Sequence, residues 1–253
     1  MFDDNNRMWS GGGDGLWIFS AGATTHVTTD RGLPSKQVNA IALGADRKTA
    51  YIATDAGIAV FDGANVTDVY TAAKNGLLSD DVGALFVASD GSLWVSYSGG
   101  FSRRPPDGNW QHFTSQGLFG GASDHFPAFV EERGNIWVAT AGDGLYEFSQ
   151  GKWTRFLSTD PGVSLPSDSF ASAALAPDGA LWFGADGQGA VRYDGKALRP
   201  GSPVPAVPAQ AGQAWQRYGV KDGLISPFVN GIYVEPGGAV WFATNGGVTR
   251  LQP

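Results

Sequence analysis

The sequence repeats itself with a period of about 43 residues. A block of apolar, aromatic, apolar and small residues recurs along the whole chain, and its aromatic positions are Trp9, Tyr51, Trp94, Trp137, Trp182 and Trp241. Successive aromatic positions are 42, 43, 43, 45 and 59 residues apart. Self-similarity at such a period indicates an array of like structural units. We therefore expect most of the conspicuous residues to have a structural role in the repeat and no role in chemistry.

Each unit consists of short strands joined by tight turns. One unit contains the apolar run 82–87, LWVSY (93–97), GGFSRR (99–104) and WQHF (110–113), with Gly, Pro and Asp between them. Short runs rich in β-branched and aromatic residues and bounded by turn residues are typical of strands. Four strands in about 43 residues make a β-propeller blade. No stretch shows a 3.6-residue apolar period, so we predict essentially no helix.

The predicted fold is all-β, a single propeller domain over 1–253 with four-stranded antiparallel blades, about six in number. Aligning Trp9 with Trp241 places the first residues inside what should be a first strand, and no fourth strand follows 247–251. We therefore expect either a fragment or one domain of a longer protein, and the six blades could be part of a seven-bladed or tandem propeller. The open edges would be completed by other residues or by the two ends pairing. The complete blades are about 38–70, 82–113, 126–156 and 170–218, and the partial blades are 1–28 and 228–253.

The large aromatic residue of each second strand is expected to pack between neighbouring blades. One buried aromatic side chain removes roughly 150–250 Å² from water, so these rings would supply much of the core. Stacking on a sugar is the alternative role for the same rings. A proline-rich insertion at 198–213 lengthens the fifth blade. It is expected to be either a solvated surface loop or a contact for a ligand or partner domain.

Composition excludes several classes of protein. The chain has 253 residues and no cysteine, which excludes disulfide scaffolds, thiolate metal sites and a cysteine nucleophile. Its net charge of −7 argues against binding to nucleic acid or anionic membranes, which reward basic surfaces. No run approaches the roughly 18 apolar residues of a membrane span, so no direct membrane insertion is expected. The acidic and polar start, residues 1–9, does not have the pattern of a signal peptide.

The segments that join the blades share a phrase that resembles a known repeat. The phrase reads TDRGLPSKQVNAI at 29–41, AKNGLLSDDVGAL at 73–85 and VKDGLISPFVNGI at 220–232. Together with the Leu-Trp pairs of the second strands, it is similar to the two-component regulator propeller repeat. The segment 45–49 departs from that repeat, because Ala-Asp-Arg-Lys-Thr replaces its Asp-Gly turn, and Ser10 and Ser96 stand where the family often has glycine.

The resemblance implies a periplasmic or extracellular sensor domain of bacterial signalling proteins. Such domains often occur as paired propellers ahead of a membrane span and a histidine kinase, and some sense oligosaccharides. We therefore expect non-catalytic recognition of a small molecule or oligosaccharide, with further propeller or signalling domains as partners. A protein-interaction scaffold is an alternative.

The candidate ligand-binding residues lie in the connections that lead into the first strands. Three repeat-equivalent aspartates could converge on a ligand or hold Ca²⁺, which prefers oxygen ligands, although no cofactor is required by any motif. The same Ser-Asp pairs could instead fix their own turns or be solvated bystanders. The predicted site residues are Lys36, Asp80, Asp124, His125 and Asp168.

An enzymatic function is the remaining alternative. His125 is the only histidine at its repeat position and could act as a general base beside Asp124 in a cation-assisted lyase or hydrolase. A solvent-exposed or packing histidine is the simpler interpretation. No nucleophile-elbow or Walker motif is present, and three scattered histidines argue against a three-histidine zinc site. We therefore assign no catalytic or metal-binding residue.

Overall fold

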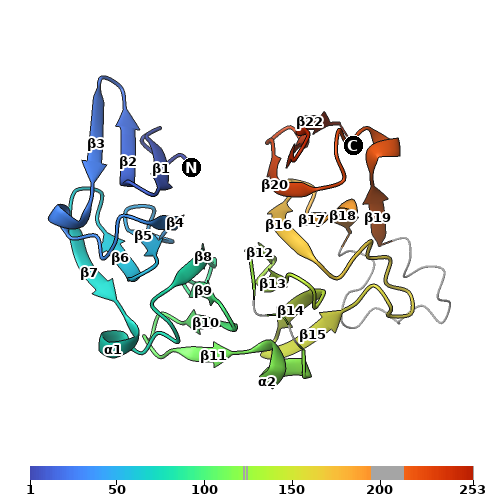
Figure 1. Cartoon of the computed structure of the whole chain (residues 1–253), viewed down its shortest axis with the longest axis horizontal. Coiled ribbons are helices and arrows are strands. Elements are labelled where there is room, and N and C mark those ends of the chain that lie inside the picture. Colours follow the sequence, from blue (N-terminus) through green and yellow to red (C-terminus); the bar gives the residue numbers. More distant parts are fainter. Residues whose placement is uncertain (122, 124, 195–213, 253) are drawn as a thin grey trace. The chain divides into compact units, whose positions relative to one another are not determined.

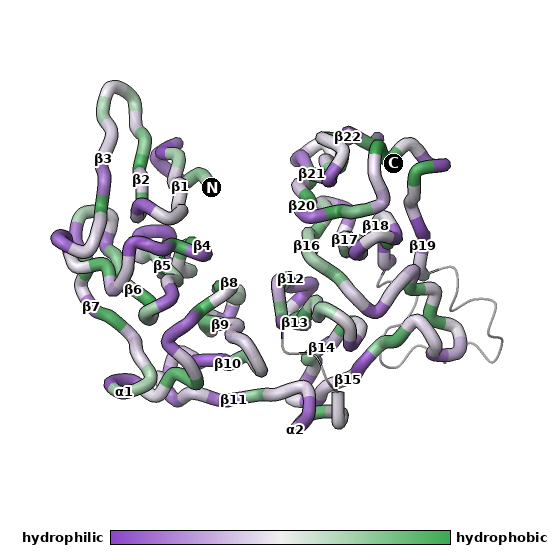
Figure 2. Tube along the Cα trace, viewed as in Figure 1, coloured by the Kyte–Doolittle hydropathy of each residue, from purple (hydrophilic) through white to green (hydrophobic). Residues whose placement is uncertain are grey.

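A computed structural model describes residues 1–121, 123, 125–194 and 214–252. These residues form six antiparallel sheets, and in each sheet consecutive strands lie side by side (Figure 1). The prediction of an all-β propeller is confirmed. Figure 2 shows hydrophobic residues along first strands such as β8 (Val82–Val87) and β16 (Phe170–Leu175), although most of their side chains are only half-buried.

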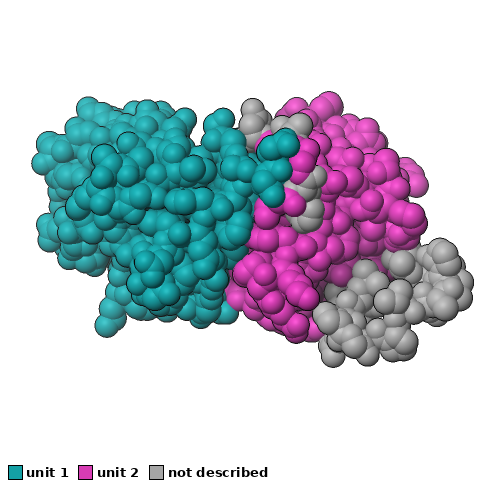
Figure 3. All heavy atoms as spheres, turned by 90° about the horizontal axis from the view of Figure 1, so that it is seen from below, with its two compact units in different colours: residues 1–117, 124–126 teal, residues 118–123, 127–253 magenta. Residues whose placement is uncertain are grey.

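The chain divides into two compact units, residues 1–117 with 124–126 and residues 118–123 with 127–253 (Figure 3). The first unit contains blades 1 to 3. Their remaining strands are β1 (Met8–Gly12), β2 (Gly15–Ser20) and β3 (Ala23–Val27), then β4 (Val38–Leu43), β5 (Ala50–Thr54), β6 (Gly57–Phe61) and β7 (Val66–Tyr70), then β9 (Leu93–Tyr97), β10 (Gly100–Arg104) and β11 (Gln111–Phe113). The single-domain assignment over 1–253 stays a prediction.

The second unit contains blades 4 to 6. Their remaining strands are β12 (Ala128–Glu132), β13 (Asn135–Ala139), β14 (Leu145–Ser149) and β15 (Lys152–Phe156), then β17 (Leu181–Ala185), β18 (Gly189–Tyr193) and β19 (Trp215–Tyr218), then β20 (Val229–Val234), β21 (Val240–Thr244) and β22 (Gly247–Leu251). Blades 1 and 6 each have three strands within the described residues. The insertion 198–213 lies outside the described residues.

The prediction of essentially no helix is wrong for the connections between blades. Single helical turns follow the fourth strands, namely α1 (Ala72–Asn75), α2 (Ser115–Phe119), η1 (Thr29–Arg31) and η3 (Val220–Asp222). In α1 the hydroxyl of Thr71 accepts the N–H of Lys74, and Gly76 ends the turn at φ 77°. One turn is too short to show a 3.6-residue period, so the pattern of apolar residues could not reveal it.

The hydrophobic core lies between successive blades. Buried clusters join blade 1 to blade 2, blade 2 to blade 3, blade 4 to blade 5 and blade 5 to blade 6. Blades 2 and 5 are therefore packed on both faces. Because each cluster takes side chains from two blades, no blade can bury its apolar surface alone.

Three of the second-strand aromatics pack onto the next blade of their unit, as predicted. Trp9 is 2% exposed and meets the ring of Phe61 edge-on at 5.7 Å. Trp137 lies 5.0 Å from the ring of Tyr193 in the next blade. Trp182 is fully buried and meets Phe242 of the next blade edge-on at 5.6 Å. In each pair the interaction joins a second strand to the following sheet.

Trp241 is the exception among these aromatics. It is 36% exposed, and its sheet is the last one of the second unit. Tyr233, directly opposite Trp241 in the sheet, is also exposed. The indole N–H of Trp241 donates to Glu235 at 2.5 Å, and the Arg250 guanidinium lies 5.7 Å from the ring. Trp241 is therefore more exposed than the other five rings at this repeat position.

Replacing a buried ring should cost far more stability than replacing the exposed ring. We expect Trp182→Ala to lower the free energy of unfolding by about 3–5 kcal/mol, because it removes buried area and leaves a cavity between blades 5 and 6. The matched variant Trp241→Ala should cost about 1 kcal/mol or less. Denaturant unfolding of both variants measures the difference, and equal losses would contradict the inter-blade role of Trp182.

Candidate functional site

Three of the predicted site residues, Lys36, Asp80 and Asp168, lie in the segments before first strands, and Pro227 occupies the same repeat position in blade 6. The backbone carbonyl of each accepts a hydrogen bond from a glycine at or directly before the start of the third strand of the preceding blade. The pairs are Gly15 N–H to Lys36, Gly57 N–H to Asp80, Gly144 N–H to Asp168 and Gly189 N–H to Pro227, at 2.8, 2.7, 2.8 and 2.7 Å. The repeat therefore places these loops by the same backbone contact.

Glycine is required at the donor position of this contact. Gly57 has φ 117°, and a Cβ there would lie 2.5 Å from the carbonyl oxygen of Tyr70 at the end of the fourth strand. Gly144 has φ 77°, and its Cβ would lie 2.1 Å from the carbonyl oxygen of Phe156. A side chain would thus clash with the neighbouring backbone in addition to straining its own. The third and fourth strands can approach closely only because of these glycines.

The carboxylates of Asp80 and Asp168 are used inside their own connections. Asp80 accepts the N–H of Ala72 at 2.6 Å. Asp168 accepts the N–H of Ser158 at 2.6 Å and its hydroxyl at 3.0 Å. These three bonds fasten the end of a fourth strand to the segment before the next first strand, which is the turn-fixing role. Asp80 belongs to the first unit and Asp168 to the second, and a ligand contact by either stays a prediction.

The other predicted residues are exposed or undescribed. The side chains of Lys36 and His125 are exposed, and Asp124 lies outside the described residues. Across the described part of the chain, no three His, Asp or Glu side chains are grouped so that they could hold a metal ion. The expectation of a Ca²⁺ site at the three aspartates therefore stays a prediction that includes an undescribed residue.

An exposed aromatic ring stands at the same loop position in blade 6. Phe228 follows Pro227, occupies the place that Gln37, Asp81 and His125 take in other repeats, and is 42% exposed. Its ring covers the backbone of Gly187, where a Cβ would lie 3.2 Å from the ring edge. The ring is therefore held over the turn between β17 and β18.

Two exposed amides complete this Phe228 site, which we define as Phe228, Gly187, Asn230 and Asn245. The Asn230 side-chain amide donates to the Asn245 side-chain carbonyl at 2.7 Å, and the Asn245 N–H donates to the Phe228 carbonyl at 3.2 Å. Sequence reasoning did not single out this site. The sequence signal for this site is that Phe228 is aromatic, whereas Gln37, Asp81 and His125 at the same repeat position are polar.

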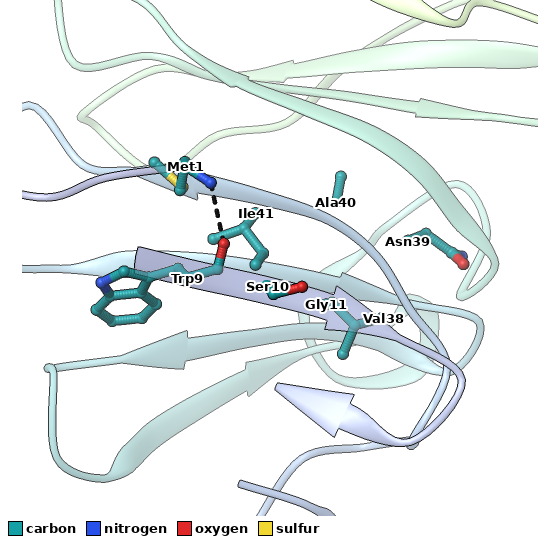
Figure 4. Close-up of a pocket in the computed structure, with 8 residues that line it drawn as sticks. All are labelled: Met1, Trp9, Ser10, Gly11, Val38, Asn39, Ala40 and Ile41. Carbon is teal, nitrogen blue, oxygen red and sulfur yellow. Dashed lines mark hydrogen bonds between the residues drawn. The ribbon is translucent and has the colours of Figure 1, made fainter. Parts of the chain in front are cut away.

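A cavity of about 290 Å³ lies beside β1 in the first unit (Figure 4). It is bordered by Trp9, Ser10 and Gly11 of β1, by Val38–Ile41 of β4 and by Met1. The amino group of Met1 donates to the Trp9 carbonyl at 2.9 Å, and the Trp9 N–H donates to the Met1 carbonyl at 2.8 Å. Met1 thus pairs with Trp9 as Tyr233 pairs with Trp241, in the register that the sequence alignment predicted.

The most displaced carboxylate pKa lies away from these loops. Burial, helped by the negative charge of Glu132, raises the pKa of Glu147 to about 7. Glu147 lies on β14 opposite Trp137, at the repeat position where Arg103, Arg192 and Arg250 stand. Each of those arginines forms an ion pair with an acidic residue between the first and second strands of its own blade. In the blade of Glu147, Arg133 lies between those two strands and pairs with Glu132 at 3.2 Å. Glu147 is therefore an acidic residue at a repeat position that carries arginine in three other blades.

Comparison with known proteins identifies the fold. No protein family model matches the sequence, and no curated protein matches it significantly. Among solved structures, the extracellular domain of a proposed hybrid two-component system from B. thetaiotaomicron has a TM-score of 0.80 and 18% identity, and the match covers 100% of this chain and 33% of that domain. The chain resembles the propellers of two-component regulators. The resemblance predicted from the repeat is confirmed at the level of the fold.

Other propellers are similar as well. The streptogramin B lyase structure has a TM-score of 0.71 and 14% identity over 100% of this chain and 77% of that chain. YCF48, solved bound to D1 peptide, has a TM-score of 0.61 and 16% identity over 99% of this chain and 77% of that chain. The chain spans about one third of the length of the two-component domain. In the described residues no helix is long and apolar enough to cross a membrane.

Removing a turn-fixing carboxylate should lower stability. We expect Asp168→Ala to reduce the free energy of unfolding by about 1–2 kcal/mol, because the N–H of Ser158 loses its acceptor. Asp80→Ala should act in the same way through Ala72. The matched control is Asp81→Ala, because Asp81 is exposed in the same turn as Asp80. Thermal unfolding compares the variants, and losses no larger than that of the control would contradict the turn role.

Glu147 should make stability depend on pH. Its folded pKa of about 7 lies above the ordinary value of 4.5, so the folded state binds the proton more tightly than the unfolded state. The free energy of unfolding should therefore fall as pH rises from about 4.5 to about 7, by roughly 2–3 kcal/mol.

Glu147→Gln should remove most of this slope and leave the neutral-pH protein more stable. The exposed carboxylate variant Asp186→Asn in the same unit is the control and should keep the slope. Denaturant unfolding at several pH values between 4.5 and 7.5 provides the measurement. An unchanged slope in Glu147→Gln would show that another group titrates in this window.

Proposed function

We propose that this propeller is a non-catalytic recognition domain that binds an oligosaccharide or similar polyhydroxylated ligand at the loops leading into its first strands. The observation that carries the proposal is the Phe228 site, where an exposed ring lies beside a pair of exposed amides. The ring is fixed over Gly187 and the amides are fixed to each other. Preorganised groups of this kind lose little freedom when a ligand binds.

The chemistry of the Phe228 site suits a sugar. The apolar C–H face of a sugar can pack on an aromatic ring, and an asparagine amide both donates and accepts hydrogen bonds, as a hydroxyl requires. The Asn230–Asn245 bond uses one donor and one acceptor, so each amide retains further bonding capacity. Asp186 and Gln188 are exposed in the adjacent turn and can add polar contacts.

The comparisons with solved structures support a location and partner domains for this function. The fold is similar over the whole chain to an extracellular domain of a two-component system, so we place the protein outside the cytoplasm, in the periplasm or at the cell surface. Because the chain spans about a third of that domain, we propose further propeller or signalling domains as its partners. Recognition at the loops would then be passed to those domains.

Enzymatic and scaffolding functions are the alternatives. The similarity to streptogramin B lyase is one of fold, and the candidate groups for a lyase are Asp124 and His125 of the sequence analysis. The similarity to a propeller solved with a peptide is the corresponding support for a scaffold. Saturable binding of an oligosaccharide that depends on the Phe228 ring is the result expected for sugar recognition.

The ligand can be found by thermal unfolding against a panel of oligosaccharides, with and without Ca²⁺. A ligand that binds only the folded state raises the melting temperature by mass action. A saturable rise with one class of oligosaccharide supports the proposal. A rise with Ca²⁺ alone would favour the predicted aspartate site over the Phe228 site. No rise with any compound would contradict sugar recognition by this chain.

Phe228→Ala should weaken oligosaccharide binding by a factor of about 5–30, the equivalent of 1–2 kcal/mol for a lost aromatic contact. Its melting temperature without ligand should change little, because the ring is already exposed. Tyr233→Ala is the matched control, since Tyr233 is an exposed aromatic of the same blade outside the site. Calorimetric titration measures both affinities. If Phe228→Ala binds like the unmodified chain, the ligand uses another surface, and Lys36→Ala and His125→Ala become the next variants.

A further inference from the structure

We propose that the ligand of the Phe228 site is an amino sugar, whose ammonium group is recognised by Phe228 together with Asp186. This inference rests on the proposed function and narrows it from oligosaccharides in general to those that carry a free amino group. The observation that carries it is an exposed carboxylate directly beside the exposed ring. A cation gains from both groups, because it is attracted to the face of an aromatic ring and to a carboxylate.

Asp186 is the sequence neighbour of the residue that the ring covers. A Cβ on Gly187 would lie 3.2 Å from the edge of the Phe228 ring, and the Asp186 Cα is about 3.8 Å from the Gly187 Cα across one peptide bond. Asp186 and Gln188 flank Gly187 in the turn between β17 and β18, and both are exposed. A ligand group above the ring is therefore within reach of the Asp186 carboxylate.

The turn that carries Asp186 is held by the connections on both of its sides. The Asp186 N–H donates to the Ser169 carbonyl at 3.0 Å, and the Gly189 N–H donates to the Pro227 carbonyl at 2.7 Å. Ser169 lies directly before β16, and Pro227 lies directly before Phe228. The ring and the carboxylate are thus attached to one fixed backbone frame within the second unit, and they lose little freedom when a ligand binds.

The charge of Asp186 is available to a ligand. In the part of the chain that the structure describes, its side chain forms no ion pair and accepts no hydrogen bond. The same turn in blade 4 contains Asp143, which is buried and pairs with Arg155 at 3.0 Å. In blade 1 the corresponding Asp14 lies 3.7 Å from the ring nitrogen of His26. Asp186 differs from both because it faces solvent without such a partner.

The corresponding turn of blade 2 has the carboxylate without the ring. Asp55 is exposed there, and the connection bonded to this turn through Gly57 carries Asp81 at the position of Phe228. Such a turn attracts cations but offers no apolar surface to a sugar. At Asp186 the ring accommodates the C–H face of the sugar while the carboxylate accepts hydrogen bonds from its ammonium group. A sugar acid would be repelled by the same carboxylate.

The test compares the tetrasaccharides of chitosan, chitin and cellulose, which share one glycosidic linkage and carry an amine, an acetamide or a hydroxyl at the same carbon. NMR titration of the unmodified chain follows the backbone amides of Asp186, Gly187 and Gln188, in a buffer acidic enough to keep the amine protonated. We expect the chitosan tetrasaccharide to bind roughly 3–20-fold more tightly than the other two, the combined effect of an exposed cation–π contact and an exposed charge pair.

Asp186→Asn should reduce this preference by a factor of about 2–5 and leave the affinity for the cellulose tetrasaccharide unchanged. Asp55→Asn is the matched control, since it removes the exposed carboxylate of the corresponding turn in blade 2, and it should leave all three affinities unchanged. Raising the ionic strength from about 0.1 M to about 1 M shortens the Debye length from about 10 Å to about 3 Å, so it should weaken the preference as well.

Four results would overturn the inference. Equal binding of the three tetrasaccharides that is lost in Phe228→Ala would reject the amino sugar and leave the proposed sugar recognition intact. A preference for the amine that is unchanged in Asp186→Asn would place the ammonium group elsewhere. Binding of trilysine as tight as that of the chitosan tetrasaccharide would show that charge alone is recognised. Absence of binding by all three tetrasaccharides would count against the amino sugar and against sugar recognition at the Phe228 site.

Discussion

The packing of a second-strand aromatic onto the next sheet is the interaction on which this structure depends. Each blade has three or four short strands, too few to bury an apolar face without a neighbour. Trp9, Trp137 and Trp182 fill that interface in their respective blades. Trp241, in the last sheet of the second unit, is a ring of the same kind that remains partly exposed.

The same repeat leaves the loops available for function. In four loops of the described residues, a glycine at or next to the start of a third strand donates to a backbone carbonyl before the next first strand, so the loop position is set by backbone contacts. The residue at the next position is Gln37, Asp81, His125 or Phe228 in different repeats. A rigid frame with one variable residue per blade suits ligand recognition. The Phe228 site is the place where the described residues combine an exposed ring with exposed amides.

The period, the strands and the role of the rings could be predicted because each recurs and has a single physical cause. The helical turns could not, since one turn leaves no periodic pattern. Asp80 and Asp168 were ambiguous because a short carboxylate suits both a turn and a ligand, and only the hydrogen bonds show the turn. Phe228 was missed because its ring depends on the close approach of Gly187, which lies 41 residues earlier in the sequence.

Native-state hydrogen exchange tests most directly whether each blade is stabilised by its neighbours. Blade 5 has clusters on both faces, so the amides of β17 should exchange slowest in the second unit, and those of β21 should exchange sooner. In the first unit, β5 should likewise outlast β1. This gradient from inner to terminal blades is the predicted result. Equal protection of β17 and β21 would contradict the account, because it would mean that a blade packed on one face is as stable as a blade packed on two.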